Sequence, residues 1–259
     1  MIQSLRKAFR VLELLADDQE QALPLGIIAD TLDLHKATCA HVLKTLGELG
    51  YVEQLGPRQG YRLGPMAYAL PRGRPYRRDL VAAAEPLMAE LAREVRETVL
   101  LAALHRGRRF TLCQIGGTQD VQVKADPMVA VNVYQTATGR LLLAHARTEE
   151  AKTFVRAAGL PGEAWPEVRS ETDLRAALAA IREAGQVVNV TPTHVVALAW
   201  PVIQNGCVVA ALGLFLPEFR FTGKHKAAVL AGMERTAAAI TEALGDRDDT
   251  DSTGCTEGS

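Results

Sequence analysis

Apolar residues recur at helical spacing along the first fifty positions of the chain. Residues 4–16 place them three or four positions apart, which predicts an amphipathic helix. Residues 25–32 predict a short second helix, and residues 36–49 a third that ends at Gly50, a residue typical of helix C-caps. The packed side of the first helix is expected to carry Leu5, Phe9, Leu12 and Leu15.

Helical spacing changes to alternation directly after the third helix. Residues 51–55 and 61–63 predict two strands, and the turn-forming sequence GPRQG joins them. Helix, turn, helix and hairpin in this order predict a winged helix-turn-helix, a device that places one helix in the major groove of DNA. We assign residues 1–64 to this domain.

The rest of the chain predicts a second domain. Residues 65–97 predict a linker rich in proline and arginine, then a connecting helix from about residue 79 that Pro86 either kinks or starts. Residues 98–244 predict an antiparallel sheet, with Asn205-Gly206 as a hairpin turn. The expected strands are TVLLAALHRG, RRFTLCQIGG, VQVKA, QVVNV, HVVALAWPVIQNG and CVVAALGLFLP, and the expected helices are 136–147, 149–158, 171–184 and 223–244. The predicted fold class is therefore α+β.

Composition fits two ordinary packed domains. The chain has 259 residues, of which 48% are hydrophobic and 23% charged. The net charge of −1 argues against a globally basic nucleic-acid protein. Residues 1–78, however, hold eleven Lys and Arg against eight Asp and Glu, so the positive excess lies in the predicted DNA-binding part. The acidic tail 245–259 is expected to be disordered.

Cysteine use and the absence of targeting signals predict a cytoplasmic protein. The four cysteines are far apart and form no CxxC pair, which favours a reducing compartment. The start MIQSLRKAFR is typical of an amphipathic helix and not of a signal peptide. No apolar run reaches the ~18 residues that a membrane span needs, so no membrane association is expected.

One side of the helix 36–49 has the properties of a DNA-reading surface. Projection at ~100° per residue gathers Cys39, Val42, Leu43, Leu46 and Leu49 on a packing side. The opposite side is small and polar, so it can approach base edges and offer hydrogen bonds. A solvated helix face would carry similar residues, and the surrounding elements are what favour DNA. The predicted DNA-binding residues are Lys36, Ala37, Thr38, His41, Lys44 and Thr45, with Arg58 and Arg62 of the hairpin as phosphate or minor-groove contacts or as plain surface arginines.

No motif in the sequence supports catalysis or metal binding. None of the six histidines stands four residues from another, and none has metal-ligand spacing to a cysteine. Serine hydrolase, Walker A and dinucleotide-binding patterns are absent. We therefore predict no enzyme, no metal and no cofactor. The alternative is a GAF-like small-molecule-binding or enzymatic domain whose winged helix serves protein contacts.

Several segments resemble the IclR family of bacterial transcriptional regulators. They are LPLGIIADTLDLHKATCAHVLKTLGELGYVE, YRLGP, TATGRLLLA at 136–144 and VVALAWPVIQNGCVVAALGLFLPEFRFT at 195–222, and the resemblance spans most of residues 1–244 in order. It implies a winged helix domain joined by a helix to a GAF/PAS-like effector domain. It also implies a homodimer formed through the N-terminal part, often paired into a tetramer, on a palindromic DNA operator. Small organic acids or aromatic catabolites are the effectors that it implies.

The resemblance also points to specific residues. The family usually has Pro, Ser and Arg where this chain has His35, Ala37 and His41, so the operator sequence is expected to differ, and a phosphate contact from residue 41 to be weaker and pH-sensitive. The effector pocket is implied between the turn that opens the helix at 136 and the late strands, because free N–H groups at a helix start suit a carboxylate. A plain N-cap would look the same. The implied pocket residues are Thr136, Ala137, Thr138, Gly139, Ala197, Gly213 and Phe215.

Two of these pocket positions affect the expected ligand. Family members that hold small acids tend to offer polar groups in the late strands, whereas Gly213 and Phe215 offer none. We therefore expect a less polar or aromatic effector, or weak binding.

Overall fold

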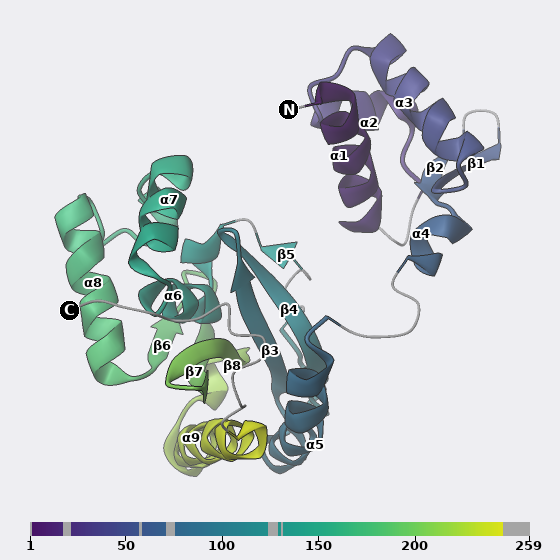
Figure 1. Ribbon diagram of the computed structural model, residues 1–259. Coiled ribbons are helices and arrows are strands. Elements are labelled where there is room, and N and C mark those ends of the chain that lie inside the picture. Colours follow the sequence, from purple (N-terminus) through teal and green to yellow (C-terminus); the bar gives the residue numbers. More distant parts are fainter. Residues whose placement is uncertain are drawn as a thin grey trace. The chain divides into compact units, whose positions relative to one another are not determined.

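The chain forms two compact units, Met1–Arg74 and Pro75–Ser259. The computed structural model describes residues 2–17, 22–56, 59–70, 76–123, 129–130 and 132–245 (Figure 1). Arg58 and the tail 246–259 lie outside the described residues, so the predictions for them stay predictions. In the part of the chain that is described, no helix combines the length and apolar character that a membrane crossing requires.

The first unit contains the predicted helix-turn-helix and hairpin. Its elements are α1 (Gln3–Asp17), α2 (Leu25–Thr31), α3 (Lys36–Glu48), β1 (Val52–Gly56), β2 (Gly60–Leu63) and α4 (Pro65–Ala69) (Figure 1). The turn between α2 and α3 passes through Asp33, whose φ of 52° lies in the left-handed region. β1 and β2 pair antiparallel with Glu53 opposite Arg62, and a bridge from Leu23 to Tyr61 ties the hairpin to the segment before α2.

The core of this unit corrects two sequence predictions. It is built from α1, α2, α3 and β1 through Val11, Leu15, Ile28, Ala29, Leu32, Cys39, Leu43, Leu46 and Val52. On α1 the packed stripe runs through Val11 and Leu15, whereas Leu5 and Phe9 are 54% and 60% exposed. Leu49, predicted to pack, is 59% exposed because α3 ends at Glu48 and Leu49 is its C-cap residue.

The second unit is a six-stranded antiparallel sheet between two layers of helices. The strand order is β5-β4-β3-β8-β7-β6. The strands are β3 (Thr98–His105), β4 (Arg108–Ile115), β5 (Val129–Ala130), β6 (Val187–Val190), β7 (Val195–Gln204) and β8 (Cys207–Pro217). The α-helices are α5 (Arg78–Val95), α6 (Ala137–Ala144), α7 (Thr148–Ala158), α8 (Glu171–Ala184) and α9 (Gly223–Leu244), and short 3-10 turns cover Val133–Gln135, Gly162–Ala164 and Glu218–Arg220.

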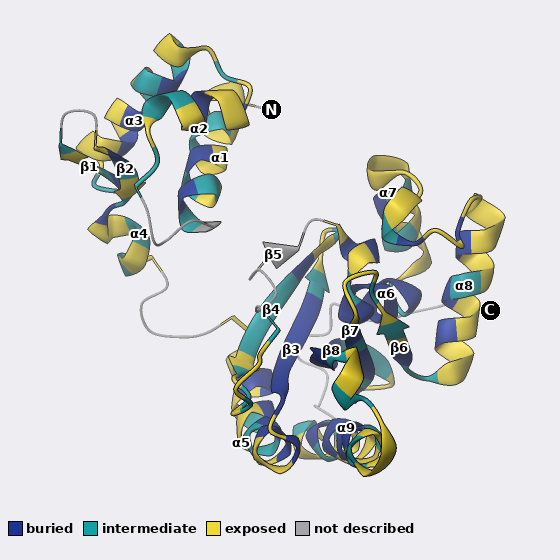
Figure 2. Cartoon of the chain, turned by 180° about the vertical axis from the view of Figure 1, so that it is seen from behind, coloured by how far each residue is buried: buried dark blue, intermediate teal, exposed yellow. Residues whose placement is uncertain are grey.

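Alternating side chains of the sheet enter two separate cores. α5 and α9 cover one face, and α6 and α8 cover the other (Figure 1). On β8, Leu214 and Leu216 enter the α5–α9 core, whereas Ala211 and Phe215 enter the α6–α8 core. The central strands are therefore buried on both faces, while the outer sides of α7 and α8 are exposed (Figure 2).

Most elements of the second unit were predicted correctly from local sequence patterns. Asn205 and Gly206 have φ of 50° and 72°, as a type I′ hairpin turn requires. α5 runs through Pro86 without starting there. The strand expected at VQVKA is wrong for Val121–Val123, which lie outside any strand, and its last two residues are outside the described part.

Candidate DNA-binding surface and effector pocket

The outer face of α3 is open in the first unit. Lys36, Ala37, His41, Lys44 and Thr45 are exposed, and Thr38 is half-buried. The opposite face holds the buried residues of α3, which are Cys39, Leu43 and Leu46. The first unit therefore leaves uncovered the side of α3 that the sequence predicted to read DNA, and contact with DNA stays a prediction.

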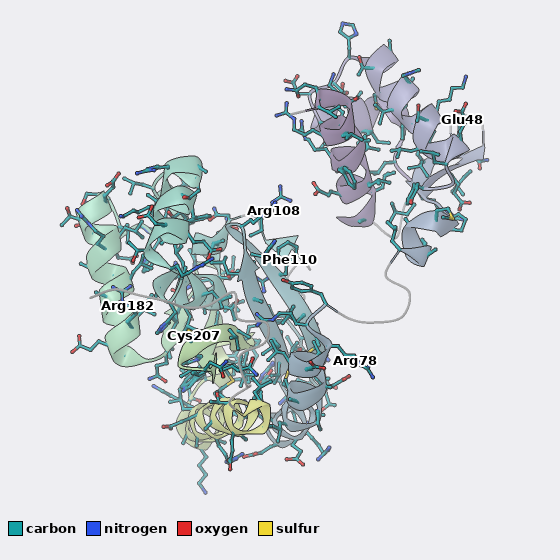
Figure 3. All side chains as sticks on the ribbon, in the orientation of Figure 1. Glu48, Arg78, Arg108, Phe110, Arg182 and Cys207 are labelled. Carbon is teal, nitrogen blue, oxygen red and sulfur yellow. The ribbon has the colours of Figure 1, made fainter. Side chains whose placement is uncertain are left out.

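Several polar groups of this surface already have partners. Lys44 Nζ lies 3.9 Å from Glu48 Oε1, with both side chains more than 60% exposed, so the attraction is weak and easily exchanged for a phosphate. Glu48 lies at the end of α3 (Figure 3). Arg62 is ion-paired with Glu53 across the hairpin, so its charge is partly compensated before any DNA binds. Thr45 Oγ1 donates to the His41 carbonyl at 3.0 Å.

A cavity of about 100 Å³ lies in the second unit where α6 begins against β7 and β8. Six of the seven residues that the family resemblance implied line it: Thr136, Ala137, Thr138, Ala197, Gly213 and Phe215. The sequence reasoning missed further lining residues, among them Gln135, Thr191 and Val123. Gln135 and Thr136 adjoin in the chain and could have been found, but Thr191 and Val123 lie in irregular segments without a motif.

Gly139 does not line the cavity, and the reason for a glycine at this position is close packing. A Cβ at Gly139 would lie 2.1 Å from the Val133 carbonyl oxygen, so the residue is needed for close packing against the 3-10 turn. Its N–H donates to Thr136 Oγ1 at 3.0 Å, which makes Thr136 the N-cap of α6. The expected free N–H at Gly139 is therefore already used. By position, the N–H groups of Ala137 and Thr138 have no acceptor within the helix.

Gly213 brings the sheet into contact with the start of α6. A Cβ there would lie 2.6 Å from Thr138 Cγ2 and 3.0 Å from Leu100 Cδ1. A polar side chain at 213 would therefore displace the helix start. Thr138 is 4% exposed, and its hydroxyl makes no hydrogen bond to another described residue. Among the described residues, the polar groups of the cavity thus come from the helix start and from Gln135 and Thr191, and none of the described lining residues is charged.

A buried arginine lies behind this helix start. Arg140 is 8% exposed and donates to the carbonyls of Tyr134 and Ala164, each at 2.8 Å, and to Asn189 Oδ1 at 3.2 Å. Its guanidinium stacks 4.2 Å from the Trp165 ring centroid. Burial lowers the pKa of Arg140, and the charge of Glu167 opposes that shift. These hydrogen-bond acceptors are neutral, so only the more distant charge of Glu167 offsets the positive charge of the guanidinium.

Sequence models of one family match both units. The model described as the IclR helix-turn-helix domain matches residues 4–56, and the one described as the bacterial transcriptional regulator IclR C-terminal matches residues 76–242. The chain belongs to the IclR family of bacterial transcriptional regulators. It therefore combines a helix-turn-helix DNA-binding domain with a C-terminal effector-binding domain, as the resemblance implied.

Individual relatives agree with this assignment over nearly the whole chain. The HTH-type transcriptional regulator KdgR of Escherichia coli (strain K12) is 25% identical over 252 residues, which cover 95% of this chain and 94% of KdgR. The crystal structure of an IclR regulator from Alicyclobacillus acidocaldarius superposes with a TM-score of 0.75 at 24% identity, covering 95% of this chain and all of the other, and shows the shared fold.

A second solved structure contains a ligand. An IclR homologue from Microbacterium hydrocarbonoxydans, crystallised with 4-hydroxybenzoate, is 25% identical to this IclR-family regulator, with a TM-score of 0.69. The match covers 93% of this chain and 98% of the homologue. Proteins of the family are transcriptional regulators and not, as a rule, enzymes. Among the described residues of this regulator, no group of three or more His, Cys, Asp or Glu is placed to hold a metal ion.

Proposed function

We propose that this regulator binds a palindromic operator through the outer face of α3 and releases or grips it in response to a small organic acid. The acid's carboxylate would accept hydrogen bonds from the N–H groups of Ala137 and Thr138 and from the Thr138 hydroxyl. The observation that carries this proposal is the start of α6, which opens onto a cavity where the Thr138 hydroxyl makes no hydrogen bond to another described residue. The positive charge of Arg140 favours the same anion.

The size of the cavity and the chemistry of its walls limit which acids can be the effector. About 100 Å³ is less than the ~150 Å³ of an engineered protein cavity that holds benzene, so the cavity as it stands suits a short aliphatic acid. Leu100, Val123 and Phe215 supply apolar walls for its hydrocarbon part. An aromatic acid, of the kind bound in the Microbacterium homologue, is the alternative and would require the cavity to widen.

The proposed oligomeric state rests on an exposed apolar stripe of α1. Ile2, Leu5 and Phe9 lie at helical spacing and are 64%, 54% and 60% exposed, which leaves an apolar stripe without a partner within the first unit. We propose that a second copy covers this stripe, giving a two-fold symmetric dimer that matches a palindromic operator. Pairing of two such dimers would produce a tetramer.

A binding assay on DNA upstream of the gene tests the DNA-binding part. Fluorescence anisotropy at several salt concentrations should show a saturable, sequence-specific complex whose affinity falls as salt rises. Equal affinity for the upstream and scrambled DNA would favour the alternative in which the winged helix contacts a protein.

Titration calorimetry tests the effector part. Pyruvate, butyrate and 4-hydroxybenzoate differ in the size and polarity of the group behind the carboxylate. Binding of a short acid, with heat that disappears in Thr138→Val, is the expected result, and Thr172→Val serves as a matched control because Thr172 is exposed at the start of α8 and does not line the cavity. Tight binding of 4-hydroxybenzoate alone would reject the proposed size limit.

A further inference from the structure

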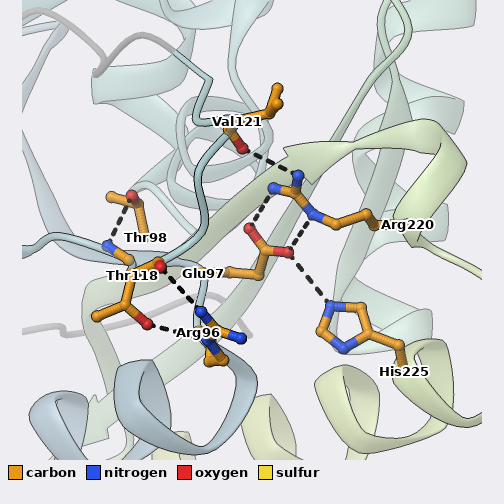
Figure 4. Close-up of polar contacts among 8 residues, drawn as sticks. Arg96, Glu97, Thr98, Thr118, Val121, Arg220 and His225 are labelled. Carbon is orange, nitrogen blue, oxygen red and sulfur yellow. Dashed lines mark hydrogen bonds and ion pairs between the residues drawn. The ribbon is translucent and has the colours of Figure 1, made fainter.

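A buried ion pair lies beside the cavity and is not part of its lining. Glu97, between α5 and β3, is 3% exposed. Arg220, from the 3-10 turn after β8, donates to both of its carboxylate oxygens, with Nε to Oε1 at 2.7 Å and Nη2 to Oε2 at 2.8 Å (Figure 4). His225 Nε2, from the first turn of α9, lies 3.3 Å from Oε1. Two parts of the chain that are more than 120 residues apart in the sequence thus meet at one carboxylate.

The remaining nitrogen of the Arg220 guanidinium, Nη1, contacts a segment that continues to the cavity. Arg220 Nη1 donates to the carbonyl of Val121 at 2.9 Å, and Val123, two residues later, lines the cavity (Figure 4). The same segment is held near its start, where the Thr118 N–H donates to the Arg96 carbonyl at 3.1 Å. A Cβ at Gly117 would lie 2.6 Å from that carbonyl oxygen, so the segment lies directly on the end of α5.

The ion pair also adjoins the cavity through the sheet. Thr98, the residue after Glu97, pairs with Phe215 of β8, whose side chain forms part of the cavity wall. Thr98 Oγ1 in turn accepts from the Gly117 N–H at 3.1 Å. Val123 is therefore connected to the Glu97–Arg220 pair through the Val121 carbonyl, and Phe215 through its cross-strand neighbour Thr98.

Stability alone is a weak reason for such an arrangement. A buried ion pair gains little over an apolar pair of equal size, because both charges lose their hydration. What it supplies is fixed geometry. The planar guanidinium is suited to bonding two carboxylate oxygens and a carbonyl at once, whereas a lysine ammonium is a single flexible point of charge.

We propose that Arg220 is a positioning residue of the effector pocket. Anchored on Glu97, it holds the Val121 carbonyl and thereby fixes Val123 as one wall of the cavity. Loss of this anchor leaves the segment 116–123 free to swing away from the cavity, which lowers the affinity for a small effector without touching the DNA-binding unit. The proposal rests on the proposed effector site.

Arg220→Lys in the full-length protein is the test, since lysine keeps a positive charge beside Glu97 but cannot also hold Val121. Hydrogen–deuterium exchange followed by mass spectrometry should show the hydrogen-bonded amides of the segment 116–123, those of Gly117 and Thr118, exchanging on the order of tenfold faster, as expected when a charge-assisted hydrogen bond is lost. Affinity for the upstream DNA without effector should be unchanged, and affinity for pyruvate should fall by about the same factor.

Arg235→Lys is the matched control. Arg235 of α9 also pairs with a glutamate of α5, Glu94, but its side chain is 61% exposed and its hydrogen bond is to Glu94 and not to the described segment 116–123. It should leave exchange and pyruvate affinity unchanged. If Arg220→Lys folds poorly, Glu97→Gln with Arg220→Met removes both charges together and should produce the same local increase in exchange.

The exchange measurement decides the proposal. Unchanged exchange of residues 116–123 in both Arg220 variants would overturn it, and so would faster exchange spread evenly over the second unit. If the wild-type protein binds none of the three acids, the proposed effector site fails, whereas the exchange result still decides whether Arg220 positions this wall.

Discussion

Alanine substitution at Leu46 and at Lys44, two positions of α3, should change the unfolding free energy by very different amounts. Leu46 is 6% exposed and packs in the core of the first unit, so Leu46→Ala should cost ~2–5 kcal/mol of unfolding free energy. In a domain of this size each kcal/mol lowers the melting temperature by ~4–8 °C. Lys44 has a side chain that is 75% exposed and loses only a weak pair with Glu48, so Lys44→Ala should change stability by less than ~0.5 kcal/mol.

For DNA binding, the informative substitution is Lys44→Ala. Lys44→Ala removes one phosphate contact from each half-site, so the slope of log affinity against log salt should become shallower by ~0.9 per subunit, or ~1.8 for a dimer. Fluorescence anisotropy at four or five salt concentrations measures this slope, and circular dichroism melting measures stability. Melting of the first unit by Lys44→Ala, or an unchanged salt slope, would refute the orientation assigned to α3.

Three further predictions concern the second unit. Gly139→Ala should destabilise it by at least ~1–3 kcal/mol because the new Cβ meets the Val133 carbonyl at 2.1 Å, and an unchanged melting curve would contradict this packing. Thr136→Ala should cost ~1 kcal/mol through loss of the N-cap bond, with recovery in Thr136→Ser by chemical denaturation. Burial, and secondarily Arg182, lower the pKa of His145 from 6.5, so the unfolded state binds the proton first and stability should fall as pH drops below about 6.5. His145→Gln should flatten that pH dependence in melts between pH 5 and 8, and an equally steep profile would show that another group causes it.

The sequence was a good guide to elements and a poorer guide to which side of them is buried. Helical spacing predicted α1, yet Leu5 and Phe9 share its apolar surface with a second stripe through Val11 and Leu15, and only the latter packs within the unit. Periodicity alone cannot rank two overlapping stripes, because both repeat every three or four residues. α3 has a single apolar stripe, so its packed side could be predicted from spacing. Only Leu49 was assigned wrongly, because the helix ends at Glu48.

The pocket was predictable where a family motif supplied it and not elsewhere. Thr136 and Thr138 belong to a matched segment, and both line the cavity. Thr191 and Val123 reach the same cavity from irregular segments, whose course depends on long-range contacts such as the bond from Arg220 to Val121. Gly139 shows the limit of a motif, because its lack of a side chain serves packing against Val133 and not ligand access.

The close approach of Gly213 to Thr138 has a practical consequence for engineering. The floor of the cavity leaves no room for an added atom there, so a screen for new ligand responses that randomises position 213 would mostly yield misfolded protein. Thr191 and Val123 border the same space from outside the regular strands and helices, but Val123 also packs against the α6–α8 core, whereas Thr191 belongs to neither core. A biosensor built on this scaffold should therefore be retuned from Thr191 first.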